Sequence, residues 1–216
     1  MLAPGELSSS VFMLPNERLR PYLTTYYCTA IEGVDGGETW DRLLPEWPSA
    51  RFTTHGVIKA EGPDGQAVPM PAAYVTGPTI RAVPFGASSA RMVGFGLLPL
   101  GWSRFFAEPA SRYANSLGDL LSLPSHIPAA AILRDLRHMD EPSDIAAYLD
   151  ATMLDVLEST PSLPRDEEAR IRQMHAILLD PATLTVADFA ERIGVGDRQL
   201  HRLTMRIFGF PPKMLL

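Results

Sequence analysis

The sequence predicts an α+β protein in which an antiparallel β sandwich or barrel precedes a set of helices. Prolines and glycines recur through residues 1–121 and separate short runs of β-branched and aromatic residues. From residue 126 onward, apolar residues recur at helical spacing instead. Hydrophobic residues make up 46% of the 216 residues and charged residues 20%, which is the composition of a folded globular protein.

Five runs in the first stretch are predicted to be strands, because they are rich in residues that favour a pleated, half-buried surface. These runs are Tyr22–Ala30, Arg51–Ile58, Ala73–Thr76, Arg81–Phe85 and Ala90–Leu97. Turn sequences containing Gly and Pro lie between them, and such frequent turns favour an antiparallel sandwich or barrel. Two short helices, Trp102–Ala107 and Ser111–Leu121, are expected to close this region.

Three further helices are predicted to connect the β region to the C-terminal end of the chain. Good helix formers run from Pro128 to Arg137, and apolar residues at helical spacing run from Ile145 to Leu157. Ser143 is the expected N-cap of the second of these helices. After a break at Thr160–Pro164, the third is predicted at Asp166–Leu179, with acidic residues in its first turn.

Residues 185–204 have the pattern of a helix-turn-helix. Thr185 and Asp188 approximate a capping box, and Ala190 is a small residue where two helices must cross closely. Gly194 follows four residues later, where a left-handed C-cap needs no Cβ atom. Asp197 then begins a second helix, in which Leu200 occupies the position of the apolar anchor.

The outward face of this second helix carries the residue types that contact DNA, namely Arg198, Gln199, His201, Arg202 and Arg206. An arginine can make two hydrogen bonds to guanine in the major groove, and a glutamine can recognise adenine. The net charge of the chain is −6, but residues 181–216 carry five basic and three acidic side chains. Because binding depends on the local field, the overall charge does not exclude DNA. An ordinary helical hairpin with a solvated arginine face is the alternative interpretation.

The sequence also resembles AraC-family transcriptional regulators. The residues that carry the likeness to the family's DNA-binding domain are Ala190, Gly194, the Leu200-His-Arg202 core and the segment Gly209-Phe-Pro-Pro-Lys213. Three N-terminal segments are similar to a sensor domain found in some of these regulators, namely Leu43-Leu-Pro45, Tyr74-Val-Thr-Gly-Pro78 and residues 93–99 with 102–109.

The resemblance implies three parts. Residues 1–125 would be a cupin-like sensor or dimerisation domain, residues 126–180 a helical linker, and residues 181–216 the first helix-turn-helix of the DNA-binding domain. It implies that Arg198, His201 and Arg202 contact bases, while we expect Arg206 to contact a phosphate. The expected partners are double-stranded DNA, a small-molecule effector and a second copy of the chain.

The sequence departs from the family pattern at three places. Gly196 stands where the recognition helix usually begins with serine, and Thr204 stands where a phenylalanine is usual, which predicts looser packing. The family domain has two helix-turn-helix units, whereas this sequence ends at Leu216. We therefore expect a truncated DNA-binding domain that binds DNA weakly, since one unit makes few phosphate contacts.

An enzyme is not expected. The five histidines are dispersed and no His-x-His pair occurs, so a cupin metal site is not predicted, and neither is any cofactor. His55 is interpreted as a surface or hydrogen-bonded residue, and Cys28 as a buried, unreactive thiol. Six aromatic residues are expected mainly in the core, with a ligand pocket as the alternative: Tyr26, Tyr27, Trp40, Trp47, Phe52 and Phe95.

Neither a signal peptide nor an apolar run of 18 residues is present, so a cytoplasmic location without membrane contact is expected. Two functions remain open. The first is a DNA-binding transcriptional regulator controlled by a small effector. The second is a cupin-like sensor or assembly protein whose DNA-binding remnant is not functional. A cupin enzyme is a third and weaker hypothesis, because metal ligands are absent.

Overall fold

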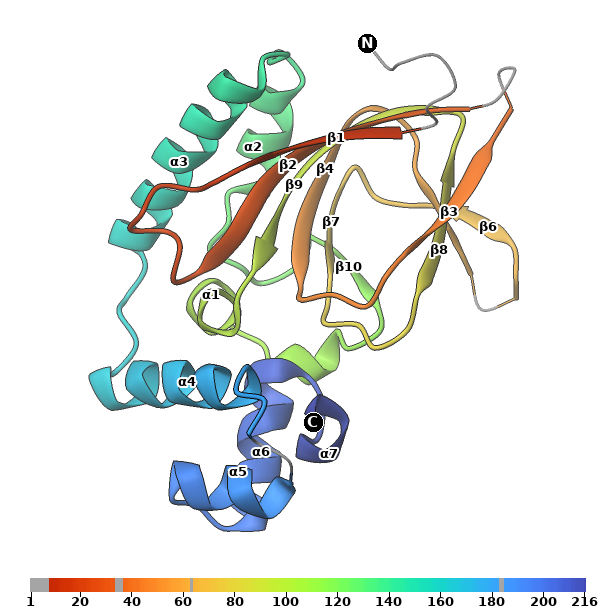
Figure 1. Ribbon diagram of the computed structural model, residues 1–216. Helices are drawn as coiled ribbons and strands as arrows, with labels where there is room; N and C mark the ends of the chain where they lie inside the picture. The colour runs from red at the N-terminus through yellow and green to blue at the C-terminus, as the bar shows by residue number, and fades with distance from the viewer. Residues whose placement is uncertain (1–7, 34–36, 63, 183–184) are drawn as a thin grey trace.

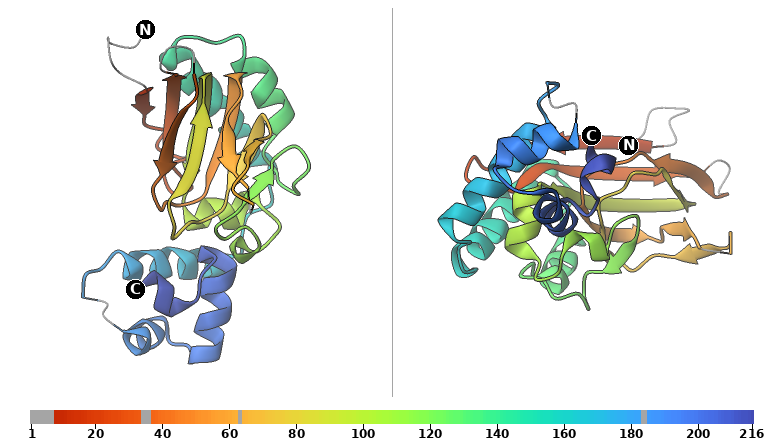
Figure 2. Two further views of the ribbon diagram at one scale, coloured as in Figure 1. Left: turned by 90° about the vertical axis from the view of Figure 1, so that its right-hand side faces the viewer. Right: turned by 90° about the horizontal axis from the view of Figure 1, so that it is seen from below.

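The computed structural model describes residues 8–33, 37–62, 64–182 and 185–216 (Figure 1). Its two β-sheets are antiparallel, and the helices lie on one outer face and at one end of them (Figures 1 and 2). The α+β class predicted from the sequence is confirmed. The two sheets are separate hydrogen-bonded units in the described residues, so the architecture is an open sandwich and not a closed barrel.

The larger sheet has six strands, and every neighbouring pair in it is antiparallel. In spatial order they are β1 (Ser8–Met13), β2 (Leu23–Glu32), β9 (Ser89–Leu97), β4 (Ser49–Gly56), β7 (Ala73–Thr76) and β10 (Leu117–Asp119). The smaller sheet has four, in the order β3 (Thr39–Leu43), β8 (Val83–Ala87), β5 (Lys59–Glu61) and β6 (Ala67–Pro69). The five predicted strands are β2, β4, β7, β8 and β9.

Side chains alternate between the two faces of the larger sheet, as they do in any strand. In β4, Ala50 and Phe52 join the core cluster on the helix-covered face. Arg51 and Thr53 alternate with them and so point toward the smaller sheet. All four residues are buried, which shows that both faces of this strand are covered.

Helices α2 (Ala129–Leu136) and α3 (Pro142–Ser159) cover the outer face of the larger sheet (Figure 1). Their buried residues belong to the same cluster as the strands, including Ile132 and Leu149, which are fully buried beside Phe52 and Phe95. These two helices are therefore part of the core of the β unit, where they shield its apolar face from water.

Two local predictions in this region are wrong. The segment predicted as a helix at Ser111–Leu121 contains a 3₁₀ turn, η2 (Ala110–Arg112), and strand β10, because Gly118 and Leu117 pair with β7. The N-cap of α3 is Glu141, and Ser143 lies inside the first turn, since proline at position 142 begins the helix. The helix predicted at Trp102–Ala107 begins earlier, as α1 (Pro99–Phe105).

A buried arginine joins α1 to the end of α3. Nη1 of Arg104 donates to the carbonyl oxygen of Pro161, and Nη2 donates to those of Leu157 and Thr160, at 2.8 and 2.7 Å. The last carbonyl groups of a helix have no partner within the helix. Arg104 supplies partners together with a positive charge, which fixes the direction in which the chain leaves the β unit.

The remaining helices form a second unit at one end of the sandwich (Figure 2). They are α4 (Arg165–Leu178), α5 (Val186–Ile193), α6 (Asp197–Phe208) and α7 (Pro212–Leu215). Ile171, Phe189 and Leu200 are fully buried in their shared core, and Leu100 of α1 packs into the same cluster. No helix in the described part of the chain is both long and apolar enough to cross a membrane.

Candidate nucleic-acid interface and ligand cavity

Helices α5 and α6 are joined in the way the sequence predicts. Thr185 accepts a hydrogen bond from the backbone of Asp188 at 3.1 Å, and Asp188 accepts one from the backbone of Thr185 at 3.1 Å. This reciprocal pair is a complete capping box. Gly194 ends α5 with φ of 71°, a left-handed conformation that favours glycine. Gly196 is the N-cap of α6 and contributes no side-chain bond.

The inner face of α6 packs on α5 and α4 through Leu200, Leu203 and Ile207, which are all buried. Thr204 is also completely buried, and its hydroxyl donates to the carbonyl oxygen of His201 at 3.0 Å. The polar group at this position is therefore satisfied within the helix, in place of the apolar contact that a phenylalanine would make.

The five predicted DNA-binding side chains of α6 are all exposed, namely Arg198, Gln199, His201, Arg202 and Arg206. They fall into two groups. Arg198 and Gln199 lie in the first turn and line none of the main cavities. His201, Arg202 and Arg206 line a groove of about 550 Å³ whose other side includes Trp102, Glu108 and Glu167.

Acidic side chains lie on the opposite side of this groove. Nη1 of Arg206 is 2.6 Å from Oε1 of Glu167 on α4, so its charge is compensated within the helical unit. Glu108 is itself paired with Arg112 at 3.1 Å. The N-terminal end of the arginine face is therefore more accessible than its C-terminal end, which points toward the β unit.

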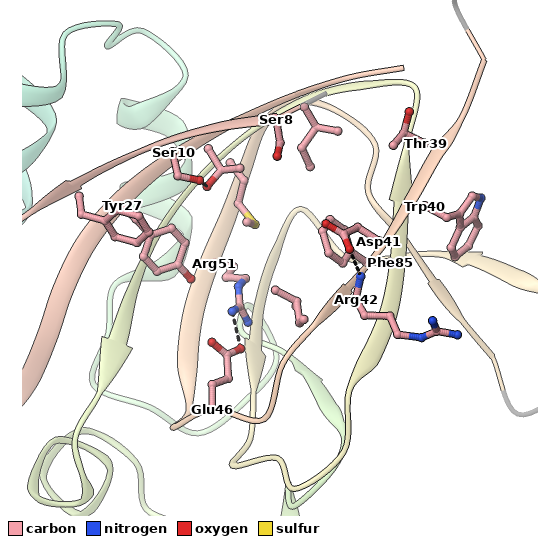
Figure 3. A pocket seen from close by; sticks show the side chains of 15 residues that line it. Ser8, Ser10, Tyr27, Thr39, Trp40, Asp41, Arg42, Glu46, Arg51 and Phe85 are labelled. Carbon is pink, nitrogen blue, oxygen red and sulfur yellow. Dashed lines mark hydrogen bonds and ion pairs between the residues drawn. The ribbon is translucent and has the colours of Figure 1, made fainter. Parts of the chain in front are cut away.

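A second candidate site is a cavity of about 540 Å³ between the two sheets (Figure 3). Strands β1 and β2 contribute one wall and β3 with β8 the other, while Arg51 and Glu46 lie at one end. Its size falls within the range of small-molecule sites. Its lining includes Ser10, Phe12, Tyr27, Thr29, Thr39, Asp41, Phe85 and Met92.

The charged group at the end of this cavity is the buried ion pair of Arg51 and Glu46. Arg51 is 2% exposed; its Nη2 atom is 2.5 Å from Oε1 of Glu46, and its Nη1 atom donates to Thr76. Burial disfavours the charged form of Arg51, but electrostatic interaction with Tyr27, Tyr74 and Glu46 keeps its pKa above the ordinary value. The arginine is therefore held charged and anchored to the strands.

Tyr27 lies beside this arginine. The Cζ atom of Arg51 is 5.9 Å from the centre of the Tyr27 ring, a separation suited to cation–π attraction. Burial raises the pKa of the Tyr27 hydroxyl, so it stays protonated at neutral pH. A side chain on Gly94 would place its Cβ atom 2.5 Å from the Tyr27 ring, so glycine at this position allows the ring to lie close to β9.

Six aromatic residues were expected in the core, with a ligand pocket as the alternative. The structure places them in three different locations. Tyr26, Phe52 and Phe95 are in the core on the helix-covered face. Tyr27 and Trp40 line the cavity. Because neighbouring residues of a strand point to opposite faces, the sequence alone could not assign Tyr26 and Tyr27 without the register of the sheet.

Trp47 occupies the third place, the junction with the helical unit. Its ring lies 5.4 Å from the His175 ring of α4 and 6.1 Å from the Phe208 ring of α6. Burial lowers the pKa of His175, which favours the neutral ring in this contact. Since Glu46 lines the cavity and Trp47 is the next residue, one short segment connects the cavity to the helical unit.

His55 and Cys28 lie outside both candidate sites. His55 is exposed and lies 3.3 Å from the Thr54 hydroxyl. Cys28 is half-buried in β2, and burial raises the pKa of its thiol. In the described ranges, no three His, Cys, Asp or Glu side chains are grouped so that they could hold a metal ion.

No protein-family model matches the sequence, and no curated protein is significantly similar to it. Among solved structures, ToxT from Vibrio cholerae is 7% identical with a TM-score of 0.42, over 97% of this chain and 79% of that one. The AraC-like transcriptional activator CuxR is 13% identical with a TM-score of 0.32, over 92% of this chain and 80% of that one. A cupin domain from Bordetella pertussis Tohama I is 18% identical with a TM-score of 0.30, over 45% of this chain and 97% of that one. With identities and scores this low, the matches assign neither a family nor an activity to this chain.

Proposed function

We propose that this chain is a DNA-binding transcriptional regulator of the AraC type, in which a small effector binds between the sheets. Helix α6 enters the major groove of duplex DNA. Arg198, Gln199, His201 and Arg202 contact base edges, and Arg206 contacts a phosphate. Binding as a dimer to paired half-sites and a location in the cytoplasm belong to the same proposal.

The observation that carries this proposal is the combination found in α5 and α6. A capping box begins the first helix, a left-handed Gly194 ends it, and the second helix has a buried apolar stripe opposite an exposed arginine face. Each of these features is common alone. Together they position a basic helix away from its own core, as major-groove recognition requires.

The segment 46–47 supports control by an effector. Glu46 forms part of the cavity, and the backbones of Glu46 and Thr79 are fixed together because Thr79 donates to the Glu46 carbonyl at 3.1 Å. Trp47 contacts Phe208 at the end of α6. A ligand that moves Glu46 therefore acts directly on a residue that supports the recognition helix, which is the differential contact that regulation needs.

The test is enrichment of sheared source-genome DNA on the purified chain at low salt. We expect the chain to retain discrete fragments, and the double variant R198A/R202A to lose them. R134A is the matched control, because Arg134 is an exposed arginine of α2 whose one ion pair among the described residues is with Asp135. Discrete fragments retained equally by R198A/R202A would contradict the assignment of α6 as the reader.

A sensor or assembly protein without DNA binding is the second candidate. It is favoured by the ion pair of Arg206 with Glu167 and by the groove that His201 and Arg202 share with the β unit. If neither the chain nor its variants enrich any fragment, this second function is supported instead. We assign no catalytic activity in either case.

A further inference from the structure

Two acids and two arginines line the cavity between the sheets, namely Asp41, Glu46, Arg42 and Arg51. Arg51 is 2% exposed, and both of its terminal nitrogens are already used by Glu46 and Thr76. An anionic ligand could reach this guanidinium only by displacing the Glu46 carboxylate. The positive charge at the end of the cavity is therefore compensated before any ligand binds.

Asp41 supplies the uncompensated charge. It pairs with Phe85 across β3 and β8, and its side chain lies beside Phe85 on the cavity side (Figure 3). Its Oδ1 atom accepts a hydrogen bond from the backbone nitrogen of Arg42 at 2.7 Å, but Asp41 forms no ion pair within the described ranges. Arg42 also lines the cavity, but its guanidinium group extends away from Asp41 and Glu46 (Figure 3).

Aromatic and apolar side chains form the rest of the walls. Phe12 and Tyr27 are paired across β1 and β2, with their rings 6.2 Å apart, and Phe85 lies on the opposite wall. Aromatic faces attract cations, and the attraction grows where water is excluded. The apolar Met92 side chain between these walls completes a surface suited to a hydrophobic body.

The hydroxyl groups of the lining contribute little to recognition of a head group. The hydroxyl oxygens of Tyr27 and Thr39 are buried, so a ligand in the cavity does not reach them without a movement of the walls. The hydroxyls of Ser10 and Thr29 are bonded to each other at 2.9 Å. The carboxylates are therefore the groups of the lining that can accept a hydrogen bond from an ammonium group.

From these observations we infer that the cavity selects an amphipathic organic cation, such as a primary amine on an aromatic or apolar body. The ammonium group lies at Asp41, toward Glu46, and the body lies between Phe12 and Phe85. The description of this ligand as the effector rests on the proposed function. The binding itself does not, because it is measured without DNA.

Three probes of nearly equal shape test the inference: tryptamine, tryptophol and indole-3-acetate, which carry a cationic, a neutral and an anionic head. They are titrated calorimetrically into the full chain up to about 5 mM, which detects millimolar dissociation constants. We expect tryptamine to bind about tenfold more tightly than tryptophol, since a charge-assisted hydrogen bond is about twice as strong as a neutral one. Indole-3-acetate is expected to bind most weakly.

The variant D41N removes the negative charge and keeps nearly the same side-chain shape. Because this side chain is exposed, we expect the variant to fold like the unmodified chain. In D41N the affinity for tryptamine falls about tenfold, to the level of tryptophol. The matched control is D64N, an exposed aspartate outside the cavity lining. Equal affinity for all three probes, tighter binding of indole-3-acetate, no binding of any probe, or no effect of D41N would each overturn the inference. Loss of DNA binding alone would affect only the proposed function.

Discussion

The two faces of the larger sheet are built from the same strands but present different kinds of side chain. On the face covered by α2 and α3, the buried side chains are apolar, and Phe52 and Phe95 are fully buried. On the opposite face the same strands present Arg51, Tyr27 and Thr53, with a cavity beside them. The difference indicates that the helix-covered face is packed with apolar side chains, whereas the opposite face borders a cavity and buries polar groups as well.

The largest expected effect comes from removing a ring on the helix-covered face. F52A should lower the free energy of unfolding by about 3–5 kcal/mol, because it removes apolar contact area and leaves a cavity. Urea denaturation measures this change. A loss below about 1 kcal/mol would show that this face is not tightly packed and would remove the contrast between the two faces.

A smaller effect is expected for the neighbouring residue on the cavity face. R51M should cost about 1–3 kcal/mol, since it removes charged hydrogen bonds but leaves Glu46, whose side chain is 31% exposed and can be hydrated. The control is R134M, because the exposed pair of Arg134 and Asp135 should contribute almost nothing. A larger cost for R51M than for F52A would reverse the comparison.

Two adjacent tyrosines of β2, one on each face of the larger sheet, allow the two faces to be compared with the same substitution. The Tyr26 hydroxyl, on the helix-covered face, donates to Asp150 at 2.9 Å, whereas the Tyr27 hydroxyl is buried near Ser49 and Arg51 and forms no hydrogen bond of good geometry among the described residues. Y26F should therefore cost about 1 kcal/mol, and Y27F should be neutral or stabilising by less than about 1 kcal/mol. Thermal or urea unfolding of the two variants side by side decides the point, and equal costs would mean that Tyr27 has a partner.

The smallest expected effect is a pH dependence at the junction of the two units. Burial lowers the pKa of His175 in the folded state, so the unfolded chain binds its proton more readily. Stability contributed by the neutral ring is complete above the unfolded pKa of about 6.5 and is lost as pH falls through the lower folded value. The free energy of unfolding of H175N, measured at several pH values, should therefore fall less steeply below this pH than that of the unmodified chain. If H175N loses stability as steeply as the unmodified chain, other titrating groups cause the pH dependence.

Local sequence signals predicted the elements in which those signals are strong. The strands with dense β-favouring residues were predicted, whereas β1, β3, β5, β6 and β10, which are short or at sheet edges, were missed. Edge strands need only one well-paired side, so their composition is less distinctive. Segment 117–119 was misinterpreted as helical because its strand character comes only from pairing with β7.

The two candidate sites also differ in how far the local sequence predicts them. The five side chains of the proposed DNA interface follow from helical periodicity, and the structure leaves all of them exposed, as predicted. The cavity could not be derived beforehand. Tyr27, Asp41 and Arg51 come from three strands, and their meeting depends on the register of two sheets.

By itself, the sequence determined the capping box at Thr185, the glycine that ends α5 and the apolar stripe of α6. These features involve residues a few positions apart, whose geometry the helix itself sets. Only the tertiary structure decided that α2 and α3 belong to the core of the β unit and that Arg51 is neutralised by Glu46. It also decided that Trp47 packs against Phe208 of α6. Contacts between elements depend on how whole faces pack together, and spacing along the chain does not encode this for any single residue.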